Sequence, residues 1–435
     1  MVVSDHLFQL IKSLSKNEKG YFKKYTSLYT HEGKSNYVKL FNIIDAQKEY
    51  NEEKVIRQLK KENFIQHISV VKNYLYNLIL KSLDTYHSNT KKELNDYLHH
   101  IEILYDKALY KQCEIMLNRA QKLAQKYESH WHLAQLSSWE AELMLAQSYK
   151  GITEEAVQKV YDDLFNNIEL YKNVHQYYNT LDNIYLHIYQ SGLSMRNEQE
   201  IEKLKNYTGL FLNKTEDAAL SYHARLLFFT CHVIHSYKNN DYPTSLKYAK
   251  KRVQLLEENP HQMAEKPTAY VKALQSQITC ERSLNKYDDA LNTIKKLKEI
   301  KVKSERLWNI SFYLANMEEL MIYLATGEFK KGTALIENTI DQNKRKNILL
   351  VPNHNQSIFH YTCAYIYLGA ENYSMCIRSL DKLLNSDLIT IRNDLYCFAK
   401  IMNLIAHYEL GNSDLLEYTV KSTYQFLYKR NKFTG

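Results

Sequence analysis

The stretch that decides the fold is Asn285–Ile300, which reads NKYDDALNTIKKLKEI. It opens with a polar turn, continues with the aromatic residue Tyr287, and places the small residue Ala290 three positions later. Apolar residues then recur at the spacing of an amphipathic helix. The same order recurs in TGEFKKGTALIENTI from Thr326 and in AENYSMCIRSLDKLL from Ala370. A recurring unit of this kind predicts a helical repeat protein.

The repeat is followed most easily through the first residue after each turn, here called the landmark. The landmarks are Tyr110, Thr153, Tyr242, Tyr287, Phe329, Tyr373 and Ser413. Neighbouring landmarks lie 40–45 residues apart, except for one gap of 89, which predicts a degenerate unit near Ser194–Gln199. Three positions after the landmarks stand Cys113, Ala156, Ser245, Ala290, Gly332, Cys376 and Leu416. All but the last are small, as expected where two helices of a hairpin approach closely, because the side chains at the contact set the distance between the axes.

The composition supports an all-α fold. Only 10 of 435 residues are Gly and 4 are Pro, so the chain has few of the residues that form hairpins and phosphate-binding loops. The 37 Tyr residues suit half-buried positions between stacked helices, because the ring is apolar and the hydroxyl is polar. We therefore expect well above two-thirds helix and essentially no strand.

The repeat resembles the tetratricopeptide repeat (TPR), a helix–turn–helix unit with a Tyr six residues before the aromatic landmark. Tyr323 precedes Phe329 and Tyr367 precedes Tyr373 in this register. The resemblance covers roughly residues 100–431 and implies an α-solenoid of about eight hairpins. The period departs from the family's 34 residues, which implies longer helices. Long-repeat relatives include bacterial peptide-sensing regulators, and the high Lys, Asn and Tyr content also suggests a bacterial source.

The family register implies which side chains line the concave surface, because the first helix of each TPR unit faces it. Aligned on the landmarks, the residues on this face are Gln275, Arg282, Met317, Met321, Tyr361 and Tyr365. Met and Tyr are adaptable anchors for apolar groups, and Arg can bind a carboxylate through two hydrogen bonds. The resemblance thus predicts a peptide with apolar anchors and an acidic group. The alternative interpretation is that Met321 and Tyr365 only fill the interior.

The N-terminal segment, residues 1–95, lacks the repeat and is predicted to form a separate basic helical bundle before the repeat region, residues 96–435. Residues 1–92 hold sixteen Lys and Arg against nine Asp and Glu. The basic side chains cluster at Lys12, Lys16, Lys19, Lys23 and Lys24. A basic face can bind phosphates, but the segment has a single Arg, and an ordinary solvated surface is the favoured interpretation.

Motifs for catalysis, cofactors and metals are missing from the sequence. There is no HExxH, P-loop, GxGxxG or GxSxG pattern. His232 and His235 share a helical face without an acidic or Cys partner at ligand spacing, and no CxxC occurs among the six Cys. No apolar run is long enough for a membrane span, and no secretory signal is evident. We expect a cytoplasmic protein that is not an enzyme and has no cofactor or metal.

Two functions are consistent with these patterns. The first is a scaffold that binds a protein or peptide on the concave surface of a solenoid. The rival is a ligand-responsive regulator whose basic N-terminal bundle contacts nucleic acid. The last helix, from Asp414 to about Arg430, shows apolar residues on two sides, Leu416, Val420 and Leu427 on one and Leu415, Tyr418 and Phe426 on the other. It is therefore predicted to contact a second subunit or a partner.

Overall fold

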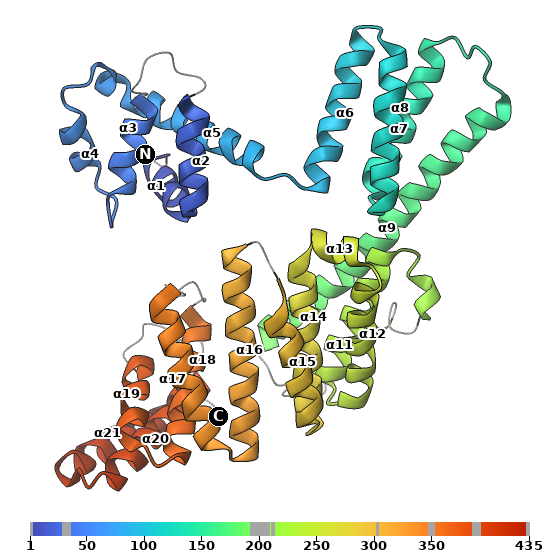
Figure 1. Ribbon diagram of the computed structural model, residues 1–435. Coiled ribbons are helices and arrows are strands. Elements are labelled where there is room, and N and C mark those ends of the chain that lie inside the picture. The colour runs from blue at the N-terminus through green and yellow to red at the C-terminus, as the bar shows by residue number, and fades with distance from the viewer. Residues whose placement is uncertain are drawn as a thin grey trace. The chain divides into compact units, whose positions relative to one another are not determined.

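A computed structural model describes residues 3–27, 36–191, 209, 214–301, 304–346, 353–384 and 393–431. Within these ranges the chain forms twenty α-helices and two short 3₁₀ helices, and no strand (Figure 1). Helix accounts for about 85% of these described residues. The expectation of an all-α protein with well above two-thirds helix is confirmed.

The chain divides into two compact units. One comprises Met1–Ala124 with Gln135–Val157, and the other comprises Gln125–Ala134 with Gln158–Gly435. The first unit contains helices α1 Val3–Ser13, α2 Lys16–Ser27, α3 Asn36–Asp45, α4 Glu52–Leu59, η1 Asn63–His67, α5 Ile68–Tyr86, α6 Thr90–Asp106, most of α7 Tyr110–Lys126 and most of α8 His130–Ala146. The boundary predicted at residue 95 falls within this unit and stays a prediction.

Helices α1 to α5 share one core, which includes Leu7, Phe22, Phe41 and Ile79. A capping box opens α2: the amide of Ser15 donates to Glu18 Oε2 at 2.7 Å, and the amide of Glu18 donates to Ser15 Oγ at 3.3 Å. Asn51 caps α4, because its side chain accepts a hydrogen bond from the amide of Lys54. Helix α5 begins at Ile68, directly after the five residues of the 3₁₀ helix η1.

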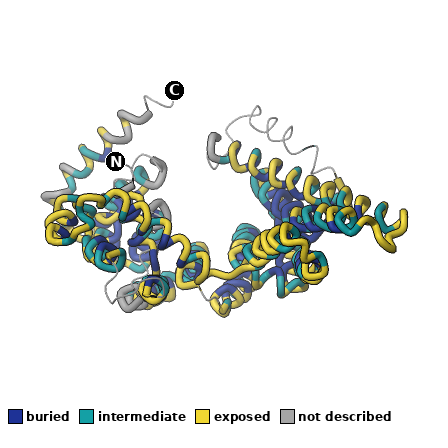
Figure 2. Tube along the Cα trace, turned by 90° about the horizontal axis from the view of Figure 1, so that it is seen from above, coloured by how far each residue is buried: buried dark blue, intermediate teal, exposed yellow. Residues whose placement is uncertain are grey.

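The second unit contains the long helix α9 and the remaining repeat helices. Their bounds are α9 Glu154–Ser191, η2 Glu216–Ala218, α11 Tyr222–Lys238, α12 Tyr242–Glu257, α13 Pro260–Glu265, α14 Pro267–Ser283, α15 Tyr287–Glu299, α16 Glu305–Thr326, α17 Phe329–Lys346, α18 Asn353–Gly369, α19 Tyr373–Leu384, α20 Asn393–Glu409 and α21 Ser413–Asn431. Consecutive helices pack on one another from α14 to α21, and α14 on α16, α16 on α18 and α18 on α20 are also in contact. Figure 2 shows the buried stretches where helices meet.

Each landmark stands at the start of a helix, which confirms the repeat register. Six landmarks are the first residue of their helix, and Thr153 immediately precedes α9. The residue two positions before every landmark has a left-handed backbone, with φ between 55° and 76°. These residues are Ala108, Gly151, Asn240, Asn285, Gly327, Glu371 and Gly411. A left-handed residue is the usual end of a helix before a tight turn.

One hydrogen bond recurs at these turns. The amide just before the landmark donates to the carbonyl six residues before the landmark, as in Glu328 to Tyr323 at 2.9 Å and Asn372 to Tyr367 at 2.9 Å. This is the bond that closes a Schellman turn. At the turn before Thr153 the amide of Ile152 donates instead to the carbonyl of Tyr149, four residues before the landmark. The sequence of this unit also matches the repeat only weakly.

The small residue three positions after the landmark lies against a neighbouring helix. Ser245 Oγ of α12 donates to the carbonyl of Val233 on α11, the other helix of its hairpin, at 2.8 Å. At Gly332 of α17, a Cβ atom would lie 2.8 Å from Cγ2 of Ile366 on α18, the first helix of the next unit, so a larger residue would require a shift. Five of the seven positions are buried, whereas Ala156 and Leu416 are half-buried.

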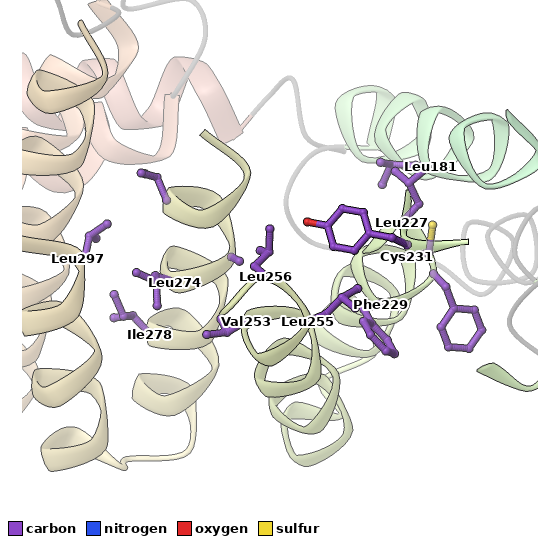
Figure 3. Close-up of a cluster of buried hydrophobic side chains, with 14 of the residues drawn as sticks. Leu181, Leu227, Phe229, Cys231, Val253, Leu255, Leu256, Leu274, Ile278 and Leu297 are labelled. Carbon is purple, nitrogen blue, oxygen red and sulfur yellow. The ribbon is translucent and has the colours of Figure 1, made fainter. Parts of the chain in front are cut away.

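Helix α9 is a departure from the expected hairpins, because its 38 residues run from Glu154 to Ser191 without a break. The degenerate unit expected near Ser194–Gln199 lies outside the described residues. In the second unit, α9, α11, α12, α14 and α15 contribute to one core. Figure 3 shows its side chains, including Leu181, Leu227, Val253, Leu274 and Leu297, lying between successive helices.

Candidate peptide-binding surface

Five of the six predicted surface residues lie twelve or eight residues before the landmark, on the helix that precedes it, and Arg282 lies five residues before. We call the positions twelve and eight residues before the landmark the inner positions. On four successive first helices they are Gln275 and Thr279 of α14, Met317 and Met321 of α16, Tyr361 and Tyr365 of α18, and Ile401 and Ile405 of α20. Because α14 packs on α16, α16 on α18 and α18 on α20, the inner positions follow one another across the stack.

The inner positions of α14 and α16 are buried or half-buried, whereas Tyr365 of α18 and both inner residues of α20 are exposed. Met317 is only 8% exposed and belongs to the chain's own interior, whereas Met321 is half-buried. Thr362 Oγ1 of α18 lies 4.0 Å from Met321 Sδ. Tyr365 is 45% exposed and Ile405 is 43% exposed. We call Met321, Tyr361, Tyr365, Ile401 and Ile405 the apolar row.

Arg282 is held by a carboxylate of this chain. Its Nε donates to Glu318 Oε2 at 3.3 Å, and Thr279 Oγ1 donates to Glu318 Oε1 at 3.2 Å. Burial raises the pKa of Glu318 above its usual range, although Arg282 and Thr279 act in the opposite direction. Gln275 is half-buried on the same helix, and its carbonyl oxygen accepts a hydrogen bond from Thr279. The α14 end of the surface is therefore polar, with its guanidinium already paired.

The exposed apolar face of α20 was missed in the sequence. Phe398, Ile401, Ile405 and Tyr408 follow one another at helical spacing and are all exposed, whereas Ala399, Met402 and Ala406 on the opposite side are buried. Counting back from the landmark Ser413 would have identified Ile401 and Ile405 at the inner positions. These residues were not identified because a helix with apolar residues on more than one side has no clear amphipathic pattern.

The last helix, α21, also exposes apolar side chains. Val420, Tyr424 and Tyr428 form a stripe with one residue per turn, and the two Tyr rings stack with centroids 6.0 Å apart. Leu416 is half-buried. The side chains of Leu415, Tyr418, Phe426 and Leu427 lie outside the described residues. Contact of this helix with a second subunit or a partner stays a prediction.

The N-terminal lysines are partly engaged within their own bundle. Lys12 Nζ donates to the carbonyl of Asp45 at 2.5 Å, and Lys19 forms an ion pair with the Asp45 carboxylate at 2.6 Å. Lys23 Nζ lies over the ring of Phe41, 5.8 Å from its centroid. Lys16 and Lys24 are exposed. Of the five lysines, Lys19 is paired with a carboxylate and the other four are exposed, so the basic surface stays a prediction.

The described residues contain no cluster of three His, Cys, Asp or Glu side chains that could hold a metal ion. His232 stacks on Tyr248 with ring centroids 4.2 Å apart, and burial lowers its pKa to about 4. Burial raises the pKa of Cys231 and of Cys376 to about 12, so both are thiols at neutral pH. In the same part of the chain, no helix is long and apolar enough to cross a membrane.

No protein-family model matches the chain, and no curated protein is significantly similar to it.

Proposed function

We propose that this protein is a non-enzymatic scaffold, built as an α-solenoid of about eight TPR-like hairpins, that binds a peptide or protein segment along the apolar row. The observation that supports this proposal most strongly is the exposure of Tyr365, Ile401 and Ile405. They occupy the positions that face the concave side in the TPR register. Interior packing, the alternative interpretation, accounts for Met317 but not for these side chains.

The spacing of the row indicates what it would bind. Tyr365 and Ile405 occupy the same position on two helices that pack together, and packed helices lie roughly 8–10 Å apart. A peptide in the polyproline II conformation advances about 3.1 Å per residue with three residues per turn, so every third side chain lies on the same face at about the same spacing. The proposed ligand carries two or three apolar side chains at every third position, which fit against successive helices.

A displayed peptide library, selected against the full-length protein, tests the proposal. The selected peptides are expected to share apolar residues three positions apart. The variant carrying both Tyr365→Ser and Ile405→Ser is expected to bind them at least tenfold more weakly, because truncation of a side chain that anchors a ligand costs about 2 kcal/mol or more.

Tyr178→Ser is the matched control, since Tyr178 of α9 is comparably exposed at 41% and lies outside the row. The thermal stability of all three proteins should be nearly equal, because exposed side chains contribute little to folding. Peptides without the three-residue spacing, or peptides that bind the double variant as well as the wild type, contradict the proposal. Arg282 is left intact, since its removal would leave Glu318 without its counterion.

A further inference from the structure

Arg252 of α12 is a buried positive charge for which the described part of the chain provides no carboxylate. Only 7% of the surface of Arg252 is exposed to solvent. Nη1 donates to Ser276 Oγ at 3.5 Å, which is a long hydrogen bond, and the buried Nε has no hydrogen-bond partner. A buried charge is strongly unfavourable unless it is paired and hydrogen-bonded, so this guanidinium requires an explanation.

The repeat itself does not require a charge at this position. Arg252 lies ten residues after the landmark Tyr242. In five other units the corresponding residue is uncharged and buried, with at most 5% exposure: Ala120, Leu297, Thr339, Leu383 and Thr423. A side chain of the Leu or Thr class therefore fills this position elsewhere, and the guanidinium is an exception to the packing rule of the fold.

The surroundings of Arg252 contain neutral hydrogen-bonding groups. Burial lowers its pKa to about 10, with Tyr185 of α9 and Cys231 of α11 acting in the opposite direction, so it remains charged at neutral pH. Cys231 does not neutralise it, because burial keeps that group a thiol. The carboxylate of Glu216 binds the neighbouring Lys251 at 2.6 Å. Ser276 is half-buried and Tyr185 is 41% exposed, so the guanidinium lies close beneath the surface.

We propose that Arg252 and Ser276 form a binding site for an oxyanion, a phosphate or a carboxylate group of a ligand. The Nε–H edge of the guanidinium, which has no partner among the described residues, matches the two-oxygen geometry of such a group. Ser276 Oγ accepts from Nη1 and donates its proton to the carbonyl of Lys272 at 2.8 Å; on ligand binding, rotation of the hydroxyl would redirect this proton from Lys272 to the oxyanion. Ser276 directly follows Gln275, an inner position of α14, so the site adjoins the polar end of the proposed peptide-binding surface. Its existence does not depend on peptide binding.

Calorimetric titration and thermal melting of the full-length protein test the site with inorganic phosphate in one arm and acetate in the other, at constant ionic strength. We expect saturable binding of the preferred anion and a rise in melting temperature of about 3 °C or more at saturation. The two arms distinguish a phosphate site from a carboxylate site. Arg252→Leu is expected to reduce the affinity at least tenfold.

Arg252→Leu also provides a readout without any anion. Because Leu297 and Leu383 occupy the corresponding position, the variant is expected to melt at the same temperature as the anion-free wild type or above it. Arg225→Leu, at an exposed Arg of α11, is the control and should leave anion binding unchanged. The proposal is overturned if neither anion binds, if both variants bind equally, or if Arg252→Leu lowers the melting temperature, which would assign the guanidinium a structural role. Loss of this site would leave the peptide selection at Tyr365 and Ile405 unaffected, so the two proposals fail separately.

Discussion

Helices α14 and α20 occupy the same place in their repeat units, yet their surfaces differ. At twelve, eight and five residues before the landmark, α14 has Gln275, Thr279 and Arg282, whereas α20 has Ile401, Ile405 and Tyr408. On α14 Thr279 and Arg282 bind Glu318, and on α20 the three apolar side chains are exposed. Both regions have the left-handed turn, at Asn285 and Gly411, whereas the small residue that follows is Ala290 in one and is replaced by Leu416 in the other. The comparison teaches that turn and packing positions maintain the hairpin, while the inner positions are free to differ in chemistry.

The largest effect is expected at the packing position. Ala290 of the α14/α15 unit is fully buried, so Ala290→Trp should force the helices apart and destabilise the protein by about 3 kcal/mol or more. The corresponding residue of the α20/α21 unit, Leu416, is half-buried, and Leu416→Trp should have a much smaller effect. Urea denaturation compares the two variants. Equal stability would show that the hairpin contact does not depend on a small residue.

A smaller loss is expected five residues before the landmark. Arg282→Ala leaves the buried carboxylate of Glu318 without its counterion and should destabilise the protein by about 1–3 kcal/mol at pH 8. Tyr408→Ala, at the corresponding exposed position of α20, should change stability by less than about 0.5 kcal/mol.

The loss in Arg282→Ala should depend on pH. Burial raises the pKa of Glu318 in the folded protein. A carboxyl with a raised folded pKa binds more protons in the folded state, so its contribution to stability is greatest at low pH and is lost as pH rises through that pKa. The variant should therefore approach wild-type stability as pH falls from 8 toward 5, measured by urea midpoints. A loss that grows on acidification would contradict this assignment.

A third prediction concerns the residue ten before the landmark, which is His232 in α11 and Asn403 in α20. Burial lowers the pKa of His232 to about 4, below the ordinary value of 6.5. The unfolded chain thus binds more protons between these values, and the stability contributed by neutral His232 is lost as pH falls from 6.5 toward 4. His232→Asn should reduce the decrease in unfolding free energy between pH 7 and pH 5 by about 1–2 kcal/mol. The exposed His99 provides a control, and His99→Asn should keep the wild-type profile.

The smallest effect is expected at the turns. Glu371 has φ of 59° before α19, whereas α21 follows Gly411 with φ of 69°. A left-handed backbone is unfavourable for residues with a Cβ. Glu371→Gly should therefore stabilise the protein by about 0.5–1 kcal/mol, and Gly411→Ala should destabilise it by a similar amount. Changes of the same sign in the two melting temperatures would show that backbone conformation does not dominate at these turns.

The sequence by itself determined the repeat and its register. Turn residues and the small residue three positions after the landmark depend on local backbone geometry and close helix contact, so they recur at fixed spacing. Tyr287, Phe329 and Tyr373 could be placed at helix starts without coordinates for this reason. Helix α9 escaped this reasoning, because the expected hairpins supplied no reason for 38 uninterrupted helical residues.

Only the tertiary structure decided which inner positions are available. Met317 and Tyr365 occupy the two inner positions of neighbouring units and both fit the predicted surface, but one is interior and the other exposed. Arg282 and Arg252 both lie on helices, and the sequence does not distinguish them. Contacts between helices show that Glu318 binds Arg282, whereas no described carboxylate binds Arg252. Burial and charge pairing arise from residues distant in sequence, so spacing along a single helix cannot predict them.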